Sequence, residues 1–262
     1  MGAPGRTSGA AVQGGNGREP CAYCHARSYS VCNAVPEEAL ATLSVLAVVR
    51  DYAKGQMLIE QGAAAEDFFN VISGTVKLYK LLADGRQQIT GFAGTGQFLG
   101  LAVTDTYTFS VQAIEPVRAC RFSRSRLRQL MDDCPQVEER LLQAACQELV
   151  TAQEQILLLG RKSAQERLAT FLIGWSRQGR PHVPAEAPVD VRVDVPVAVP
   201  AADRVRLPMT RGEIADHLGL TIETVSRTFS RFRADGRIRT PSSHEVVITD
   251  RPYLERLAAG AG

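Results

Sequence analysis

The chain has 262 residues, of which 45% are hydrophobic and 22% are charged, and its formal net charge is +2 at pH 7. That composition is typical of a globular protein, and the length suffices for one large core or two modest ones. It excludes a membrane-spanning chain, because no apolar run approaches the roughly 20 residues that such a helix needs. The small net charge gives no sign of the partner, so evidence for nucleic-acid binding has to come from local charge.

The N-terminal residues divide into a glycine-rich stretch and a cysteine-rich one. Residues 1–18 include six glycines and lack the apolar stretch of a secretory signal, so we expect disorder there and a cytoplasmic protein. Residues 19–34 carry three of the six cysteines, Cys21, Cys24 and Cys32. Thiols stay reduced in the cytoplasm, so this cluster predicts metal ligands on a segment with little other reason to fold. Both zinc, with or without His25, and iron–sulfur clusters accept cysteine ligands of this kind.

Residues 35–130 are predicted to form a β-barrel. Over residues 53–122, short apolar runs alternate with turns that contain glycine, for example at 73–74, 84–85 and 94–96. This pattern is typical of an antiparallel sandwich or barrel. Residues 117–122 have the composition of its last strand.

Residues 131–163 are predicted to form mainly one long helix. After Pro135 neither glycine nor proline occurs before Gly160, and apolar residues recur at alternating spacings of 3 and 4. A helix of about 25 residues reaches about 37 Å, more than one small barrel can cover. We therefore interpret the stripe as a contact between two copies of the chain, although packing on its own domain would give the same pattern. The predicted dimer contact contains Leu142, Ala145, Leu149, Ala152, Ile156 and Leu159.

The C-terminal part begins with a helix and a proline-rich linker over residues 164–205, where an irregular linker and an extra hairpin both remain open. Residues 206–262 are predicted to hold a winged helix-turn-helix. Thr210 and Glu213 have the spacing of a capping box, which would start the first helix. Ala215, Gly219 and Val225 then suit a close helix crossing, a tight turn and a shared core. Strands over 237–240 and 245–248 would form the wing.

The second helix of this motif presents a polar face suited to DNA. Glu223, Ser226 and Arg227 stand at i, i+3 and i+4, so they share one side of the helix. Arginine can bind guanine, glutamate can accept from cytosine, and serine can reach a base edge or a phosphate. A solvated face with a weak Glu–Arg pair is the simpler alternative. Residues 204–239 carry eight arginines against four acidic residues, and the predicted contacts to the DNA backbone are Arg231, Arg233 and Arg237.

A barrel, a long helix and a winged helix in this order resemble the Crp/Fnr family of transcription regulators. Residues 88–92, 156–159 with 164–169, 209–214 and 219–227 are similar to its Fnr branch, and the resemblance covers about residues 20–250. It implies an α+β fold: an N-terminal double-stranded β-helix barrel of the cyclic-nucleotide-binding type, a dimerisation helix and a C-terminal winged helix-turn-helix. It also implies a homodimer without enzymatic activity that reads a TTGAT-like inverted repeat. Activation is usual in this family, through a barrel loop such as 82–87 that touches RNA polymerase.

The resemblance also bears on cyclic nucleotides. Most barrels of this family bind them through a glutamate that follows a glycine and through a later arginine. Here Leu101 follows Gly100, and residues 108–110 read Thr-Phe-Ser, so both charged groups are missing. A buried phosphate without a cation is strongly disfavoured, and we therefore expect no cyclic nucleotide.

Fnr-type oxygen sensors instead resemble this chain in their cysteines: an N-terminal triplet and a fourth cysteine before the dimer helix hold a [4Fe–4S] cluster. This implies Cys21, Cys24, Cys32 and Cys120 as ligands. The seven residues between Cys24 and Cys32 depart from the spacing of the best-known members and resemble the rhizobial FnrN/FixK-like subgroup, which keeps the cluster. Cys134 and Cys146 are expected to be packing or surface residues.

These features together predict an oxygen-responsive regulator of anaerobic or microaerobic genes, with nitrogen fixation among the candidate targets. Glu154 lies beside the predicted dimer contact, where two copies would repel each other and leave the cluster to favour the dimer. The alternatives are a regulator without iron, controlled by zinc, thiol oxidation or abundance, and an iron–sulfur redox protein.

Overall fold

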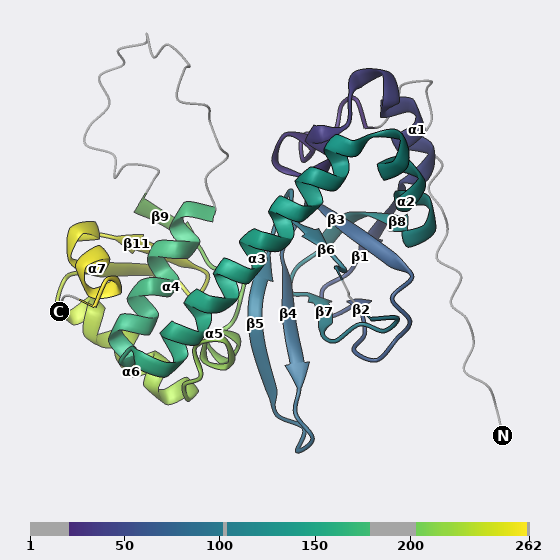
Figure 1. Cartoon of the computed structure of the whole chain (residues 1–262). Coiled ribbons are helices and arrows are strands. Elements are labelled where there is room, and N and C mark those ends of the chain that lie inside the picture. Colours follow the sequence, from purple (N-terminus) through teal and green to yellow (C-terminus); the bar gives the residue numbers. More distant parts are fainter. Residues whose placement is uncertain (1–20, 102–103, 179–202, 261–262) are drawn as a thin grey trace, which may run out of the picture. The chain divides into compact units, whose positions relative to one another are not determined.

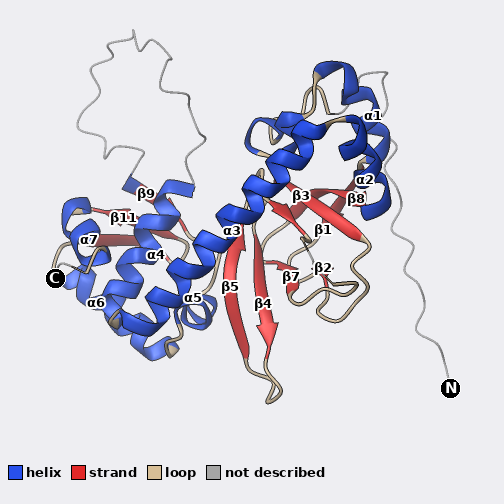
Figure 2. Ribbon diagram, viewed as in Figure 1, coloured by secondary structure: helices blue, strands red, loops and turns tan. Residues whose placement is uncertain are grey.

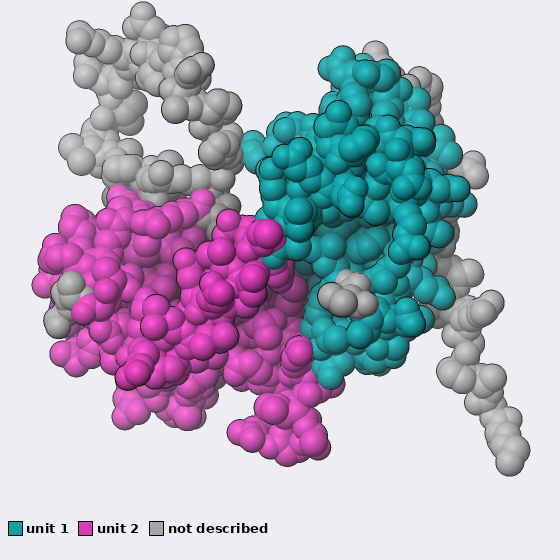
Figure 3. Space-filling model, viewed as in Figure 1, with its two compact units in different colours: residues 1–76, 93–145 teal, residues 77–92, 146–262 magenta. Residues whose placement is uncertain are grey.

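The computed structural model of the protein describes residues 21–101, 104–178 and 203–260. The predicted disorder of residues 1–18 and most of the linker within 164–205 lie outside the described residues. Contacts divide the chain into two compact units, residues 1–76 with 93–145 and residues 77–92 with 146–262, which Figure 3 colours separately. No helix in the described ranges is both long and apolar enough to cross a membrane.

Antiparallel strands dominate the barrel region (Figure 2). One sheet has the order β1-β8-β3-β6 and consists of β1 (Val48–Tyr52), β8 (Val117–Ser123), β3 (Asp67–Ser73) and β6 (Phe98–Leu99). The other has the order β2-β7-β4-β5 and consists of β2 (Met57–Ile59), β7 (Ser110–Ala113), β4 (Val76–Leu81) and β5 (Gln87–Ala93). Gly74, at the turn after β3, has a φ of +85°, and a Cβ there would lie 2.3 Å from the backbone oxygen of Pro116. Only glycine fits this turn, and the strand predicted over 117–122 is confirmed as β8.

Short helices share one apolar core with the first sheet. They are η2 (Val31–Ala34), η3 (Glu37–Ala39), α1 (Leu40–Leu46), α2 (Arg124–Asp133) and the beginning of α3 (Pro135–Arg161), and they are preceded by η1 (Arg27–Tyr29), which has no buried residue. Leu43, Leu130 and Val137, from three of these helices, are each at most 2% exposed. Cys21 and Cys120 belong to the same core, which therefore places the cysteine segment against β8.

α3 is a single long helix within the predicted range 131–163 (Figure 1). α4 (Ala164–Gln178) follows it, and the C-terminal elements are β9 (Arg204–Arg206), α5 (Arg211–Leu218), α6 (Ile222–Ala234), β10 (Ile238–Ser242), β11 (Glu245–Ile248) and α7 (Arg251–Ala258). The three strands form a sheet with the order β10-β11-β9, and α4 packs against α7 and α6. The two predicted wing strands are confirmed as β10 and β11.

Candidate functional site

The first helix of the helix-turn-helix, α5, begins and ends as its sequence predicts. Thr210 Oγ1 accepts a hydrogen bond from the Glu213 backbone N–H at 3.2 Å, and Glu213 Oε2 accepts one from the Thr210 backbone N–H at 2.8 Å, which completes the capping box. Gly219 ends the helix in the left-handed conformation with a φ of +60°. Ala215 and Val225 are buried, so α5 and α6 share the predicted core.

The predicted base-reading residues occupy the exposed side of α6. Glu223, Ser226 and Arg227 are all exposed, whereas Val225 and Phe229 of the same helix are buried. The pKa of the Glu223 carboxyl is lowered mainly by its own backbone N–H and the Thr221 hydroxyl, and least by Arg227. Glu223 is therefore an ionised acceptor at neutral pH, and its attraction to Arg227 is a minor interaction rather than the reason for this face.

The three arginines predicted to contact the DNA backbone differ in their surroundings. Arg233 is exposed, and Arg231 is exposed and lies 3.8 Å from Asp235, measured from Nε to Oδ2. Arg237 instead pairs with Asp250 and stacks at 4.3 Å over the ring of Tyr253. Arg231 and Arg233 thus have solvent-facing charges, while Arg237 already helps to hold β10 to α7.

Sequence reasoning missed the arginine at the start of α5, Arg211, which lies close to the recognition helix. The guanidinium of Arg211 stacks 3.4 Å from the centre of the Phe229 ring. Burial lowers the pKa of Arg211 to about 10, and its Nη1 atom is buried without a hydrogen-bond partner. Its position at the first residue of α5 was visible in the sequence, but the ring beneath it comes from another helix and could not be read there.

Sequence reasoning also missed the side chains that hold the C-terminal end of α5. Gln88 of β5 donates to the Asp216 carbonyl at 2.6 Å, Gln155 of α3 to the His217 carbonyl at 2.8 Å, and Arg167 of α4 to the Leu218 carbonyl at 2.8 Å. The last carbonyls of any helix lack partners within it, so such donors are needed. The sequence gives the need but not which distant side chains meet it.

An aromatic cluster adjoins these contacts and includes one titratable residue. The His217 ring lies 5.3 Å from the ring of Phe92 and 5.8 Å from that of Phe171, and its Nδ1 is 3.2 Å from the Ile89 carbonyl oxygen. Burial lowers the pKa of His217, so the neutral imidazole is favoured.

The four cysteines of the predicted ligand set lie near one another. Cys21 and Cys120 are buried, and Cys24 and Cys32 are half-buried. Burial, together with smaller contributions from electrostatic repulsion by the other three thiols, raises the pKa of Cys120 to about 12. Burial likewise raises the pKa of Cys32 to about 11, with contributions from Cys21 and Cys24. The chain folding thus brings Cys120 of β8 together with a triplet almost 90 residues earlier in the sequence.

Apolar packing and hydrogen bonds hold the cysteine segment, so the prediction that it has little reason to fold without a metal is wrong. Val31 and Val35 are buried in the core beneath it. Arg27 donates to the Val35 carbonyl at 2.9 Å and to the Cys32 carbonyl at 3.4 Å, and the Ser30 hydroxyl accepts from the Cys32 backbone N–H at 3.2 Å. These contacts give the segment apolar packing and hydrogen bonds of its own.

The thiols fit an iron–sulfur cluster in kind and in number. Such clusters take four thiolates, and the predicted ligand set supplies four free thiols, those of Cys21, Cys24, Cys32 and Cys120. As they stand, no three His, Cys, Asp or Glu side chains of the described residues form a group that could hold a metal ion. Ligation would therefore require the four thiols to converge. His25 is exposed, Cys134 is buried in the same core, and Cys146 is exposed on α3.

The predicted dimer contact on α3 is largely exposed. Leu142, Leu149 and Ile156 are 65%, 60% and 71% exposed, and their spacing of seven residues places them on one side of the helix. Glu154, Ala145 and Ala152 are exposed as well. Leu159, at the end of this stripe, is half-buried and lies close to Gly219.

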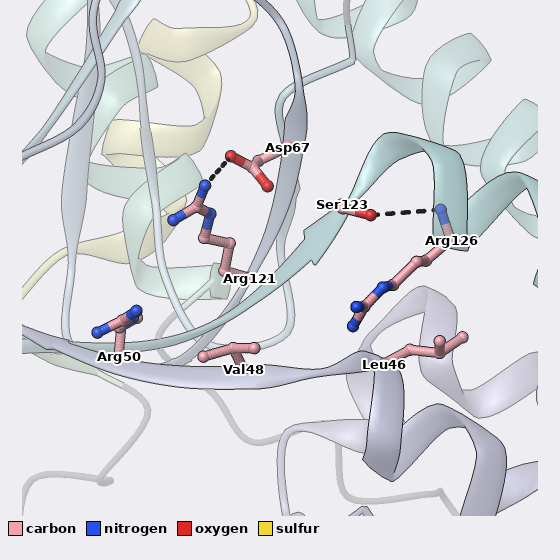
Figure 4. Close-up of a pocket in the computed structure, with 7 residues that line it drawn as sticks. All are labelled: Leu46, Val48, Arg50, Asp67, Arg121, Ser123 and Arg126. Atoms are coloured by element: carbon pink, nitrogen blue, oxygen red, sulfur yellow. Dashed lines mark hydrogen bonds and ion pairs between the residues drawn. The ribbon is translucent and has the colours of Figure 1, made fainter. Parts of the chain in front are cut away.

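A small basic hollow of about 150 Å³ lies among β1, β3, β8 and the start of α2 (Figure 4). Arg121 Nη2 and Asp67 Oδ2 form an ion pair at 2.6 Å within it, and Arg50 and Arg126 also line it. Its charge would suit an anion. It does not involve Gly100 and residues 108–110, at which the sequence lacks the charged groups of a cyclic-nucleotide site.

Comparison with known proteins agrees with these domains. Residues 49–134 match the family model of the cyclic nucleotide-binding domain, and residues 166–257 match that of the Crp-like helix-turn-helix domain. The chain is 37% identical to the nitrogen fixation regulation protein FixK of Bradyrhizobium diazoefficiens, over 91% of this chain and 94% of FixK. It is 34% identical to the transcriptional activator protein FnrL of Cereibacter sphaeroides, over 92% of each chain. The solved structure of FixK2 from Bradyrhizobium japonicum has a TM-score of 0.70 and 33% identity, and the match covers 82% of this chain and 99% of that one.

Proposed function

The chain belongs to the Crp/Fnr family of transcription regulators, and on that premise we propose that it is an oxygen-responsive activator that binds a TTGAT-like inverted repeat as a dimer. Membership makes it a DNA-binding regulator and not an enzyme. Beyond family membership, we propose the DNA sequence that is bound, the dimer, the oxygen signal and a contact with RNA polymerase. The observation that carries this proposal is that one chain contains both an exposed recognition face on α6 and four neighbouring thiols in the barrel unit.

The exposed face of α6 supports direct reading of bases. Arg227 offers a two-pronged donor for guanine, and the ionised Glu223 offers an acceptor for cytosine, with Ser226 between them. All three side chains are exposed because the opposite side of α6 is filled by the buried core of the motif.

Titration of fluorescent DNA duplexes with Arg227→Ala tests this role. A good bidentate arginine–guanine contact gives about 1–3 kcal/mol of discrimination, so the variant should lose that preference at one base pair of each half-site. Arg233→Ala is the matched control, because loss of a phosphate contact weakens binding to all sequences alike. Unchanged sequence preference in Arg227→Ala would remove this residue as a base reader.

The stripe on α3 supports a homodimer. Leu142, Leu149 and Ile156 expose large apolar side chains at heptad spacing, and a second copy of the same helix in parallel would cover them. Burying one such side chain is worth about 1.5–3 kcal/mol relative to leaving it in water. Two half-sites of an inverted repeat also require two copies of α6 related by a twofold axis.

The four thiols support a cluster-controlled switch, with Cys21, Cys24, Cys32 and Cys120 as the residues that would hold the cluster. When bound, a [4Fe–4S] cluster supplies a group that oxygen degrades. The cysteine segment shares its core with α2 and the beginning of α3, including Val137 and Leu141. A change in the order of residues 21–34 would therefore alter the packing at the start of the dimer helix. In this way the oxygen signal would reach the DNA-binding dimer.

Glu154 gives the dimer a weak point on which the signal can act. Its exposed carboxylate lies between Leu149 and Ile156 along α3, so two copies would approach each other in the dimer. Glu154→Ala removes this repulsion and should allow DNA binding in air. Oxygen sensitivity equal to that of the wild type in this variant would contradict the role of Glu154.

The barrel is proposed to work without a cyclic nucleotide and to contact RNA polymerase through residues 82–87. The glutamate and arginine that hold a cyclic nucleotide are missing at Leu101 and at residues 108–110. Residues 82–86 lie in the exposed turn between β4 and β5, where a large partner has access. Addition of cAMP should leave the DNA affinity unchanged. Substitutions in the turn should lower transcription but not DNA binding.

Anaerobic purification separates the proposed signal from its alternatives. We expect a brown protein with about equal iron and sulfide that loses its colour and its DNA affinity in air. Cys24→Ser should abolish the colour, whereas Cys146→Ser, which changes an exposed cysteine outside the set, should not. A colourless protein that contains zinc, or DNA binding that air does not change, would reject the iron–sulfur signal and leave the regulator without iron.

A further inference from the structure

A buried polar side chain lies in the sheet that carries Cys120. Asn70 of β3 is 1% exposed, and its Oδ1 atom is buried without a hydrogen-bond partner. Leaving a buried polar atom unpaired costs about 1–3 kcal/mol, so such atoms normally have a partner.

The register of the sheet places this amide beside the thiol. β3 and β8 are antiparallel neighbours (Figure 1), and Asn70 pairs directly with Cys120. Directly paired residues of antiparallel strands project to the same face, with Cβ atoms about 5 Å apart. Phe68 and Phe122, the next pair on that face, belong to the same core as Cys21 and Cys120. The Asn70 amide therefore lies on the face of the sheet where the four thiols gather.

We propose that Asn70 is a positioning residue of the cysteine site and that its amide hydrogen-bonds the sulfur atoms of the cluster held there. This inference rests on the proposed function. A thiolate or sulfide sulfur accepts hydrogen bonds, and the amide can turn by half a rotation so that its two N–H donors take the place of Oδ1. Hydrogen bonds to the sulfurs tune an iron–sulfur cluster, and partners of metal ligands typically change affinity or activity 10- to 100-fold when removed.

Asn70→Leu tests this role, because the substitution should not destabilise the metal-free protein but should weaken retention of the cluster in the loaded protein. The metal-free variant loses an unpaired polar atom and keeps a similar volume, so its urea unfolding midpoint should be equal to that of the wild type or higher. The loaded variant loses a hydrogen bond, so its cluster absorbance should disappear about 10- to 100-fold faster under chelator without oxygen. Its reduction potential should also fall, because hydrogen bonds to the sulfurs stabilise the reduced cluster.

Val71→Ala is the matched control, since Val71 is fully buried one residue further along β3 on the opposite face. It should lower the unfolding midpoint of the metal-free and loaded chains alike and leave the potential unchanged. If Asn70→Leu does not fold, Asn70→Ala replaces it. The measured quantity is then the effect of the substitution on the loaded chain compared with its effect on the metal-free chain.

The outcomes separate the two proposals. If wild-type protein takes up no iron under anaerobic reconstitution, the proposed function fails. If it takes up iron and Asn70→Leu retains the cluster as long as the wild type, only the role of Asn70 is overturned. A loss of stability in metal-free Asn70→Leu as large as in the loaded form would show a purely structural amide and would overturn the role as well.

Discussion

Replacing Gly219 by alanine perturbs the turn of the helix-turn-helix in two separable ways. Gly219 has a φ of +60°, a conformation that costs a residue with a Cβ about 1–2 kcal/mol. The added Cβ would also lie 3.1 Å from Leu159 Cδ2 and 3.4 Å from Arg167 Nη1. The first contact is tighter than a normal van der Waals approach, so Leu159 at the end of α3 must move. We expect a total loss of about 2–3 kcal/mol in the free energy of unfolding.

Gly236 provides the matched control for this prediction. Its φ is +68°, and a Cβ there would meet nothing within 4 Å, so Gly236→Ala reports the backbone cost alone. Urea unfolding followed by circular dichroism measures both variants, and Gly219→Ala should be the less stable. In a Leu159→Ala background, the loss caused by Gly219→Ala should be smaller, because the crowding atom is gone. A Gly219→Ala variant as stable as Gly236→Ala would refute the argument that α3 packs tightly against this turn.

Three further predictions follow from the same structure. Gln155→Leu removes the donor that lies 2.8 Å from the His217 carbonyl oxygen. The free energy of unfolding, measured with urea, should fall by about 1 kcal/mol. A loss below the experimental error would contradict this expectation. Leu149→Glu places a charge in the predicted dimer contact and should give a monomer in sedimentation, whereas Leu157→Glu, with a similarly exposed side chain off the stripe, should stay dimeric. Because burial lowers the pKa of His217 in the folded chain, the unfolded chain takes up the proton first as the pH falls below about 6.5. Stability should therefore decline below that pH, and the decline should be smaller in His217→Gln; equal slopes would contradict it.

The helix-turn-helix could be predicted from the sequence because its signals are local. Thr210 and Glu213 lie within one turn of helix, and Gly219 takes a conformation that only glycine adopts without strain. The spacing to Val225 then fixes which residues the two helices bury. The wing strands and the long helix follow from equally local sequence patterns, so the residues within each element were enough to predict it.

Other features depend on residues that are far apart in the chain. Asn70 meets Cys120 only because β3 and β8 pair in one particular register, and a shift of one residue would turn both side chains to the other face. Gln88, Gln155 and Arg167 reach the end of α5 from three different elements. No local pattern marks these glutamines, since the same residue is ordinary on any exposed surface.

The cysteine segment shows the division between sequence and structure in one place. The sequence by itself determined which residues carry thiols and that three of them cluster near the N-terminus, since this is a matter of spacing. Only the tertiary structure decided that Val31 and Val35 anchor the segment and that Cys120 lies beside it. The physical reason is that burial and long-range strand pairing depend on the whole core, whereas caps, turns and helical faces depend on a few neighbouring residues.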